Sequence, residues 1–146
     1  EIKSEIRNQV DSCFNTLEDN YEKRNYNIDL NKKDYSVNLL PNRIEVDFDY
    51  ELSLSKTNEE SQEYDSLSVS IDNNLYELVS IASSILQWET KYGDSETTMY
   101  MTNYPDLKVE KKKQSDGTTI YILTDRETEN KFQFASRSLA WPPGYA

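Results

Sequence analysis

Four carboxylates alternate with apolar residues along one stretch of the chain, and they form its most regular set of chemically active side chains. They are Glu45, Asp47, Asp49 and Glu51. Alternate residues of a β-strand share one face at a spacing of about 7 Å, so oxygens from a neighbouring strand would complete a site for Ca²⁺. No calcium loop of the D-x-D-x-D-G type is present. A solvated strand face paired with Lys108 or Lys112 is the favoured interpretation, and a metal site on these four residues is the alternative.

Several residue types that enzymes depend on are missing or rare. The 146 residues include no histidine, which removes the commonest general base and metal ligand. Three scattered glycines leave no phosphate-binding loop. Paired carboxylates hydrolyse glycosides without histidine, but among 27 acidic residues some pairs come close by chance. We therefore expect no enzymatic activity and no cofactor.

The single cysteine, Cys13, excludes an internal disulfide and a cysteine-based zinc site. It stands among the apolar positions of a predicted helix. Free cysteine is commonly buried as a small apolar residue, and we expect that of Cys13.

The C-terminal residues supply a second candidate site. Residues 142–145 read Pro-Pro-Gly-Tyr, the P-P-x-Y form that aromatic-lined grooves recognise. With the preceding tryptophan, the candidate interaction residues are Trp141, Pro142, Pro143 and Tyr145. A mobile terminus, or a strap with Trp141 packed back on the domain, is the alternative.

The charge of the chain restricts its partners. A formal charge of -11 repels nucleic acid and anionic membrane surfaces. The basic run at residues 111–113 is short and precedes the turn residues 115–117, so it reads as a hairpin tip. We expect a protein partner or self-assembly, and no nucleic acid.

Hydrophobic spacing predicts the elements that position these residues. Apolar residues three and four apart predict a helix over about the first 22 residues and another from Asn74, with a capping box at Asn74 and Glu77, to Gly93. Alternation predicts strands at 26–30 and 35–39 around a polar turn at 31–34, and a long strand at 43–55. After an exposed loop at 56–63, further strands are predicted at 67–71, 98–101, 107–112, 119–123 and 131–135.

Helices grouped apart from runs of strands indicate the α+β class, with helices on one face of an antiparallel sheet. The length favours one domain with one core. We place that domain at residues 1–137, followed by an extended tail at 138–146.

The order of elements resembles that of a group of uncharacterised archaeal proteins from small-genome lineages. The resemblance spans about residues 6–136 and rests on the helix with its cysteine, the strand at 44–54, LSVSIDNNLYELVSIA at 67–82, LKV at 107–109, TIYILTD at 119–125 and FQFA at 132–135. Those proteins carry a pilin-like N-terminal membrane helix. The resemblance implies that this chain is their extracytoplasmic part, and it supplies no catalytic residues.

These observations lead to one expected function and one alternative. The chain begins at Glu1 rather than methionine, and we expect a membrane anchor to precede it. We expect a non-catalytic domain of the cell surface that works through protein contacts, within a filament or an adhesive assembly. The alternative is an ion- or carbohydrate-binding domain that uses the acidic strand face and neighbouring tyrosines.

Overall fold

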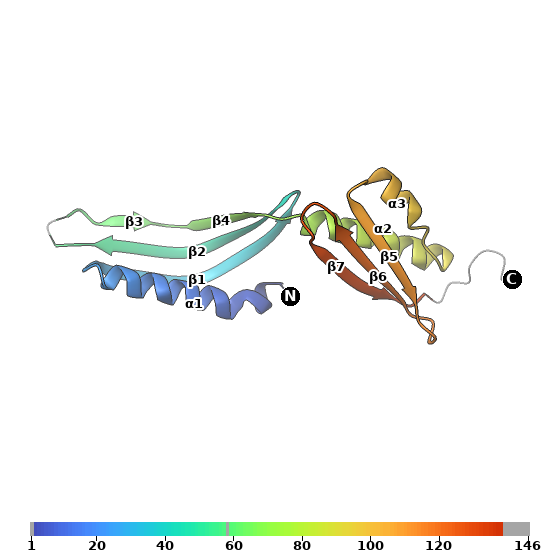
Figure 1. The fold of residues 1–146 in the computed structure, drawn as a ribbon. Coiled ribbons are helices and arrows are strands. Elements are labelled where there is room, and N and C mark those ends of the chain that lie inside the picture. The colour runs from blue at the N-terminus through green and yellow to red at the C-terminus, as the bar shows by residue number, and fades with distance from the viewer. Residues whose placement is uncertain (1, 58, 139–146) are drawn as a thin grey trace. The chain divides into compact units, whose positions relative to one another are not determined.

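The computed structural model describes residues 2–57 and 59–138. The contacts within the chain divide it into two compact units, residues 1–72 and 73–146, called the N-terminal and C-terminal units below. Helices and antiparallel strands occur in both, so the predicted α+β class is confirmed (Figure 1). We expected one hydrophobic core, but the described residues hold two separate clusters, one in each unit.

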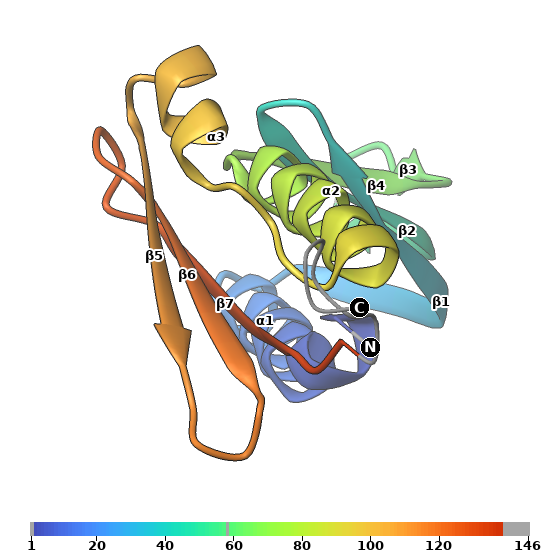
Figure 2. The same ribbon diagram turned by 90° about the vertical axis from the view of Figure 1, so that its right-hand side faces the viewer.

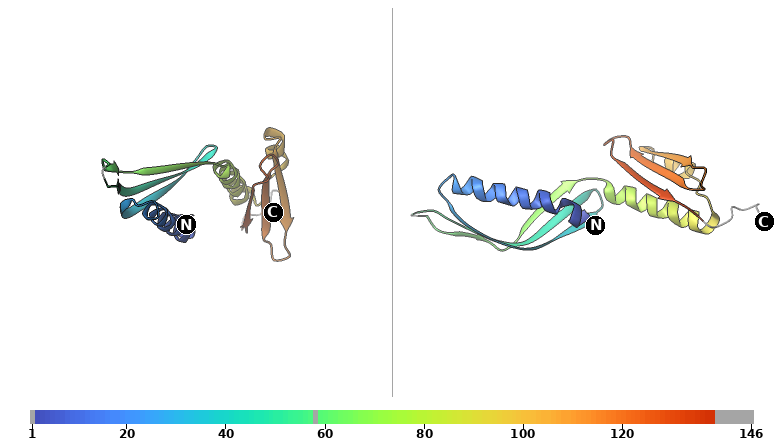
Figure 3. Two further views of the ribbon diagram at one scale, coloured as in Figure 1. Left: turned by 60° about the vertical axis from the view of Figure 1, so that its left-hand side comes forward. Right: turned by 90° about the horizontal axis from the view of Figure 1, so that it is seen from below.

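The N-terminal unit is one long helix on a four-stranded antiparallel sheet (Figure 3). Strand β2 is central: it pairs with β1 along one edge and with β3 and β4 along the other. The elements are α1 (Ile2–Glu22), β1 (Asn27–Leu40), β2 (Arg43–Ser55), β3 (Gln62–Tyr64) and β4 (Leu67–Asp72).

Aromatic rings form the core under α1. Phe14, the one buried residue of the helix, places its ring 5.0 Å from that of Phe48 and 4.7 Å from that of Tyr50. Tyr35 adds a further ring beside Phe48 and donates its hydroxyl to the carbonyl oxygen of Lys3 at 2.7 Å. The faultless alternation of β2 thus supplies one face of aromatic and aliphatic side chains, as predicted.

Three local predictions for this unit are wrong. The loop predicted at 56–63 ends before its last two residues, which belong to β3. The polar residues 31–34 do not form a turn between two strands, because β1 continues through them with a register shift between Lys32 and Asp34. Such a bulge absorbs one extra residue without ending the strand. Cys13 is exposed rather than buried, since it lies one position from Phe14 and shares its side of the helix with Gln9 and Thr16.

The C-terminal unit places α2 (Leu75–Tyr92) against one face of a three-stranded sheet (Figure 2). The strands are β5 (Leu107–Lys113), β6 (Thr119–Asp125) and β7 (Lys131–Ser136), in that order, and a short helix, α3 (Thr98–Asn103), precedes them. The buried cluster joins α2 to β5 and β6 through Leu78, Ala82, Ile85, Leu107, Val109, Tyr121 and Leu123.

The ends of α2 differ in how well the sequence predicts them. Gly93 ends the helix in the left-handed conformation, with φ 74°, as glycine after a helix commonly does. The predicted capping box is wrong, because the side chain of Asn74 accepts a hydrogen bond from Asn130 instead of capping the helix. Asn73 Oδ1 accepts from the Leu75 amide at 2.9 Å.

One predicted strand is wrong in type. Residues 98–101 fall within the helix α3. In the part of the chain that the structure describes, no helix has the length and apolar character needed to cross a membrane.

The N-terminal core predicts a contrast between two neighbouring residues. Phe14→Ala should lower the free energy of unfolding by about 3 kcal/mol, since it removes a buried ring and leaves a cavity. Cys13→Ala should change it by less than about 0.5 kcal/mol, because exposed positions contribute little. Denaturant unfolding followed by circular dichroism measures both, and equal losses would contradict the assignment of Phe14 as the core residue.

Candidate functional site

The acidic row lies on the outer face of β2, opposite α1, where the alternation placed it. Neighbouring strands supply hydrogen bonds to its oxygens. Asp47 accepts from Asn38 Nδ2 at 2.9 Å and from Ser68 Oγ at 2.8 Å. Both of its carboxylate oxygens are therefore engaged by β1 and β4.

Glu51, at the other end of the row, forms the ion pair that was expected of Lys108 or Lys112. Its partner is Lys33 of β1, with Nζ 2.5 Å from Oε1, and Asn31 Nδ2 donates to Oε2 at 3.0 Å. The hydrogen bond from Lys33 lowers the pKa of Glu51, and the same bond raises the pKa of Lys33.

The four carboxylates of the row do not come together as a group that could hold a cation. Among residues 2–57 and 59–138, no three histidine, cysteine, aspartate or glutamate side chains lie together in a way that could hold a metal ion. Glu51 also lines a shallow hollow of about 300 Å³ beside the exposed ring of Tyr64. Its other lining residues are Asp29, Asn31, Leu52, Ser53, Glu63 and Asp65.

A second surface, on the C-terminal unit, gathers large apolar side chains that are not buried. We call it the aromatic surface and define it by Trp88, Tyr92, Met99 and Tyr100. Trp88 is 49% exposed and Met99 62%. The rings of Trp88 and Tyr92 stack with centroids 4.9 Å apart and an angle of 28° between their planes.

The helix α2 makes this surface by turning one row of residues to the core and the next row outward. Ala82, Ile85 and Glu89 are buried at spacings of three and four, on the row that faces the sheet. Trp88 and Tyr92 are also four apart, so they share a face, but that face lies beside the buried row. The most hydrophobic ring of α2 is thus left half in solvent.

Trp88 lines two hollows. One, of about 180 Å³, is lined by Ser84, Trp88, Glu96, Met99, Tyr100 and Asn103. The other, of about 250 Å³, is lined by Gln87, Trp88, Lys91 and Tyr92. Pockets for small ligands usually measure about 300–1,000 Å³. Hollows of this size fit protein side chains better than a drug-sized ligand.

One polar contact joins α3 to α2, and a second lies within the segment that begins α3. The hydroxyls of Ser84 and Tyr100 share a hydrogen bond of 2.7 Å. Glu96 Oε1 accepts from the Thr98 amide at 2.8 Å, at the start of α3. The bond from Ser84 fixes the position of the Tyr100 ring at the wall of the hollow.

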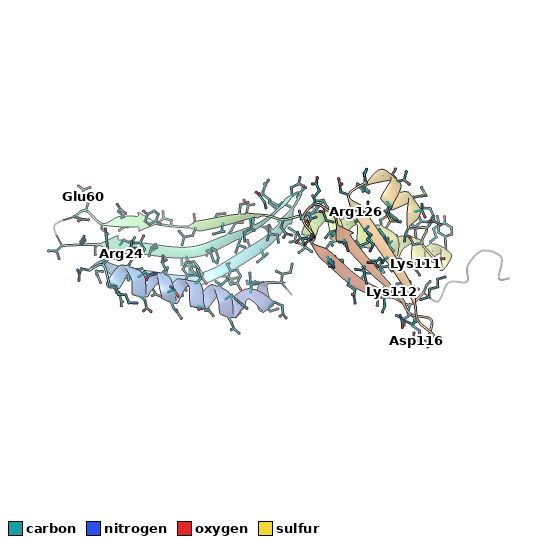
Figure 4. The ribbon with its side chains drawn as sticks, viewed as in Figure 1. Arg24, Glu60, Lys111, Lys112, Asp116 and Arg126 are labelled. Carbon is teal, nitrogen blue, oxygen red and sulfur yellow. The ribbon has the colours of Figure 1, made fainter. Side chains whose placement is uncertain are left out.

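The loop before α3 is anchored to the sheet by Lys111 of β5 (labelled in Figure 4). Lys111 Nζ forms an ion pair with Asp94 and donates to the carbonyl oxygen of Ser95 at 3.0 Å. Partial burial opposes ionisation of Asp94, but the hydrogen bond and the charge of Lys111, with Lys113 3.6 Å away, lower its pKa overall. The basic run at 111–113 therefore has a positioning role in addition to its place near a hairpin turn.

The residue that follows Trp88 on α2 is a buried glutamate. Glu89 is 3% exposed and accepts a hydrogen bond from the hydroxyl of Tyr121, which is fully buried. Burial, and then the bond to Glu89, raise the pKa of the Tyr121 hydroxyl far above its ordinary value. Because solvent scarcely reaches either group, we assign the pair to holding α2 on the sheet rather than to chemistry on a substrate.

None of the four residues that define the aromatic surface was a sequence-based candidate. Of the predicted tail, only Ser138 is described, and its hydroxyl donates to the carbonyl oxygen of Glu89 at 2.7 Å. The candidates Trp141, Pro142, Pro143 and Tyr145 lie outside the described residues.

The periodicity contained one signal for the aromatic surface that we did not use. Trp88 stands at the margin of the apolar stripe of α2, with Tyr92 one turn later. A large ring at the edge of an amphipathic stripe is half exposed by geometry. The contribution of α3 could not be found in this way, since residues 98–101 were assigned to a strand.

Comparison with protein-family models, with curated proteins and with solved structures gives no match to this chain. The resemblance to archaeal surface proteins therefore stays a prediction.

The Lys111 anchor predicts a pH-dependent loss of stability. Lys111→Gln should lower the free energy of unfolding by about 1 kcal/mol at pH 7, a value kept small because Asp94 is partly solvated. The pKa of Asp94 is lower in the folded chain than its ordinary 3.8. The stability that the ion pair contributes is therefore complete above the ordinary value of 3.8, and it is lost as the pH falls through the lower pKa of the folded chain.

Urea unfolding at pH 7 and pH 3 tests this, with Lys112→Gln on the same strand as the matched control. The deficit of the Lys111 variant should shrink at pH 3, while the control should stay close to the parent chain at both. A deficit that grows on acidification would contradict the role of Asp94.

Proposed function

We propose that this chain is a non-catalytic domain of the cell surface that works through protein contacts, and that the aromatic surface is its main contact. The observation that carries the proposal is the exposure of Trp88 and Met99 beside two hollows of side-chain size. Tryptophan, tyrosine and methionine are enriched in protein interfaces, and tryptophan is enriched among the residues that dominate binding energy.

The free energy that covering Trp88 would contribute supports Trp88 as the main contact residue. A tryptophan side chain presents up to about 250 Å², so covering the exposed half of Trp88 would contribute roughly 3 kcal/mol at 25 cal/mol per Å². The Tyr92 ring stacked on it, and the ordered Tyr100, reduce the freedom that Trp88 would lose on binding. The surface is therefore partly preorganised for a partner.

The composition supports a binding role over catalysis. The sequence has no histidine, and the most deeply buried acid and tyrosine, Glu89 and Tyr121, bind each other inside the core. The location outside the cytoplasm, behind a membrane anchor and within a filament or adhesive assembly, is part of the proposal. It is supported by the resemblance to archaeal surface proteins.

A second candidate function is binding of a sugar at the acidic face of the N-terminal unit. It is favoured by the hollow in which Glu51 lies beside the exposed ring of Tyr64, since aromatic rings and carboxylates together suit sugar hydroxyls and ring faces. Loss of polysaccharide binding in Tyr64→Ala, with Trp88→Ala unaffected, would favour this candidate over the first.

Substitution of Trp88 tests the main proposal. The purified chain is co-sedimented with the envelope fraction of its source cells, and bound chain is measured over a range of concentrations. Trp88→Ala should weaken this binding about 30-fold, as expected for a residue worth about 2 kcal/mol.

Tyr76→Ala is the matched control, because Tyr76 is an aromatic residue of α2 that is 41% exposed and lies outside the aromatic surface. It should bind like the parent chain. Equal binding by all three proteins, with each shown to be folded by circular dichroism, would reject the aromatic surface as the contact.

A further inference from the structure

The strand β4 forms an open edge of the four-stranded sheet. It pairs with β2 from Phe48↔Leu67 to Arg43↔Asp72, and within the described residues it has no other strand partner. The backbone groups of β4 that face away from β2 therefore have no partner strand. Such an edge is a ready template for another strand.

The opposite edge of the same sheet is protected, and β4 is not. Strand β1 has a bulge beside two lysines, Lys32 and Lys33, and α1 packs against it. Bulges and edge lysines are common devices against unwanted strand pairing. Residues 67–71 of β4 read Leu-Ser-Val-Ser-Ile, with no charge, no proline and no register shift.

The apolar face of β4 is uncovered as well. Val46 of β2 is 7% exposed, whereas Val69, paired with it on β4, is 48% exposed. Ile71, the next residue on that face, is 54% exposed. The difference in exposed fraction between these paired valines indicates that α1 covers β2 and leaves β4 uncovered.

We propose that β4 pairs antiparallel with β4 of a second copy of this chain. The reason for choosing a second copy is that residues 67–71 are palindromic in character. Pairing centred on Val69 sets Leu67 against Ile71 and Ser68 against Ser70, so apolar side chains meet on one face and hydroxyls on the other. A slip of one residue would place serines against apolar side chains.

This pairing is suited to a strongly acidic chain. No charged side chain lies within the five paired positions, so the junction adds no direct pairing of like charges. The arrangement is two-fold and closed, since the same strand serves both copies. It would join two sheets into one and bring the exposed Val69 and Ile71 rows of both copies together, although the short junction implies weak, concentration-dependent association.

The inference is independent of the aromatic surface. The residues that carry it belong to the N-terminal unit, and those of the proposed function belong to the C-terminal unit. A variant such as Met99→Lys should reduce contacts of the aromatic surface and leave β4 pairing intact. The two proposals can therefore fail separately.

Cysteine cross-linking tests the register. In a Cys13→Ser background, Val69→Cys places two thiols directly opposite each other on the two-fold axis, and mild oxidation should give a covalent dimer. Ile71→Cys is the matched control on the same face of the same strand, because its thiol would lie opposite Leu67 and about 13 Å from its counterpart, four strand residues away. Equal cross-linking of both variants, or none of Val69→Cys, would overturn the proposal.

Sedimentation velocity provides a second test without cysteine. The parent chain should show a rising dimer fraction with concentration, and Met99→Lys should behave like the parent. Val69→Lys, at a position already half exposed, should keep the fold and remove the dimer. A parent chain that stays monomeric at millimolar concentration, or a Val69→Lys variant that still dimerises, would overturn the proposal.

Discussion

The width of a helix sets what this fold can bury. A helix with its side chains is about 10–12 Å across, whereas strands lie about 4.8 Å apart, so one helix covers roughly two strands. Each unit places one long helix on a sheet that is wider than this. In the C-terminal unit α2 lies against β7, where Phe134 stacks on Tyr121 at 5.2 Å, and the short helix α3 lies against the edge strand β5. In the N-terminal unit the corresponding strand, β4, offers the smaller Val69 and Ile71, which stay exposed.

Several charged residues help to fix this architecture. Carboxylates that looked available for chemistry in the sequence accept hydrogen bonds from neighbouring strands, as Asp47 does, or form ion pairs, as Glu51 does. In the C-terminal unit Lys111 ties down the loop before α3, and Glu89 binds Tyr121 inside the core. Large apolar and aromatic side chains such as Trp88 and Met99 nevertheless stay exposed, and they are the physical basis for proposing a binding role.

Periodicity predicted the parts of the fold that depend on one face of one element. The stripe of α1, the alternation of β2 and the end of α2 at Gly93 are of this kind. Periodicity failed where the conformation of a segment depends on the element that pairs or packs with it. The polar residues 31–34 read as a turn because the sequence does not show that β2 continues beside them. Six residues of α3 are too few for a period to be recognised, and their β-branched and aromatic members favoured a strand.

The candidate site was likewise predicted where a single element decides the result and missed where a neighbouring strand decides it. The acidic row was placed on the correct face of β2, because that follows from a period of two. Its lysine partner could not be predicted, because Asn31 lies opposite Glu51 and Lys33 reaches it from the register shift of β1, which the sequence does not show. Cys13 was expected in the core because it is adjacent to Phe14 in sequence, but one step along a helix turns a side chain by 100°.

Amide hydrogen exchange of β4 at low and high protein concentration tests the central claim, that the cover provided by α1 stops at β2 and leaves an open strand for a second copy. We predict that at low concentration the amides of residues 67–71 that face away from β2 exchange quickly, and that at high concentration they become protected while β1 is unchanged. Slow exchange of these amides at every concentration would contradict the open edge, and fast exchange at every concentration would contradict its pairing.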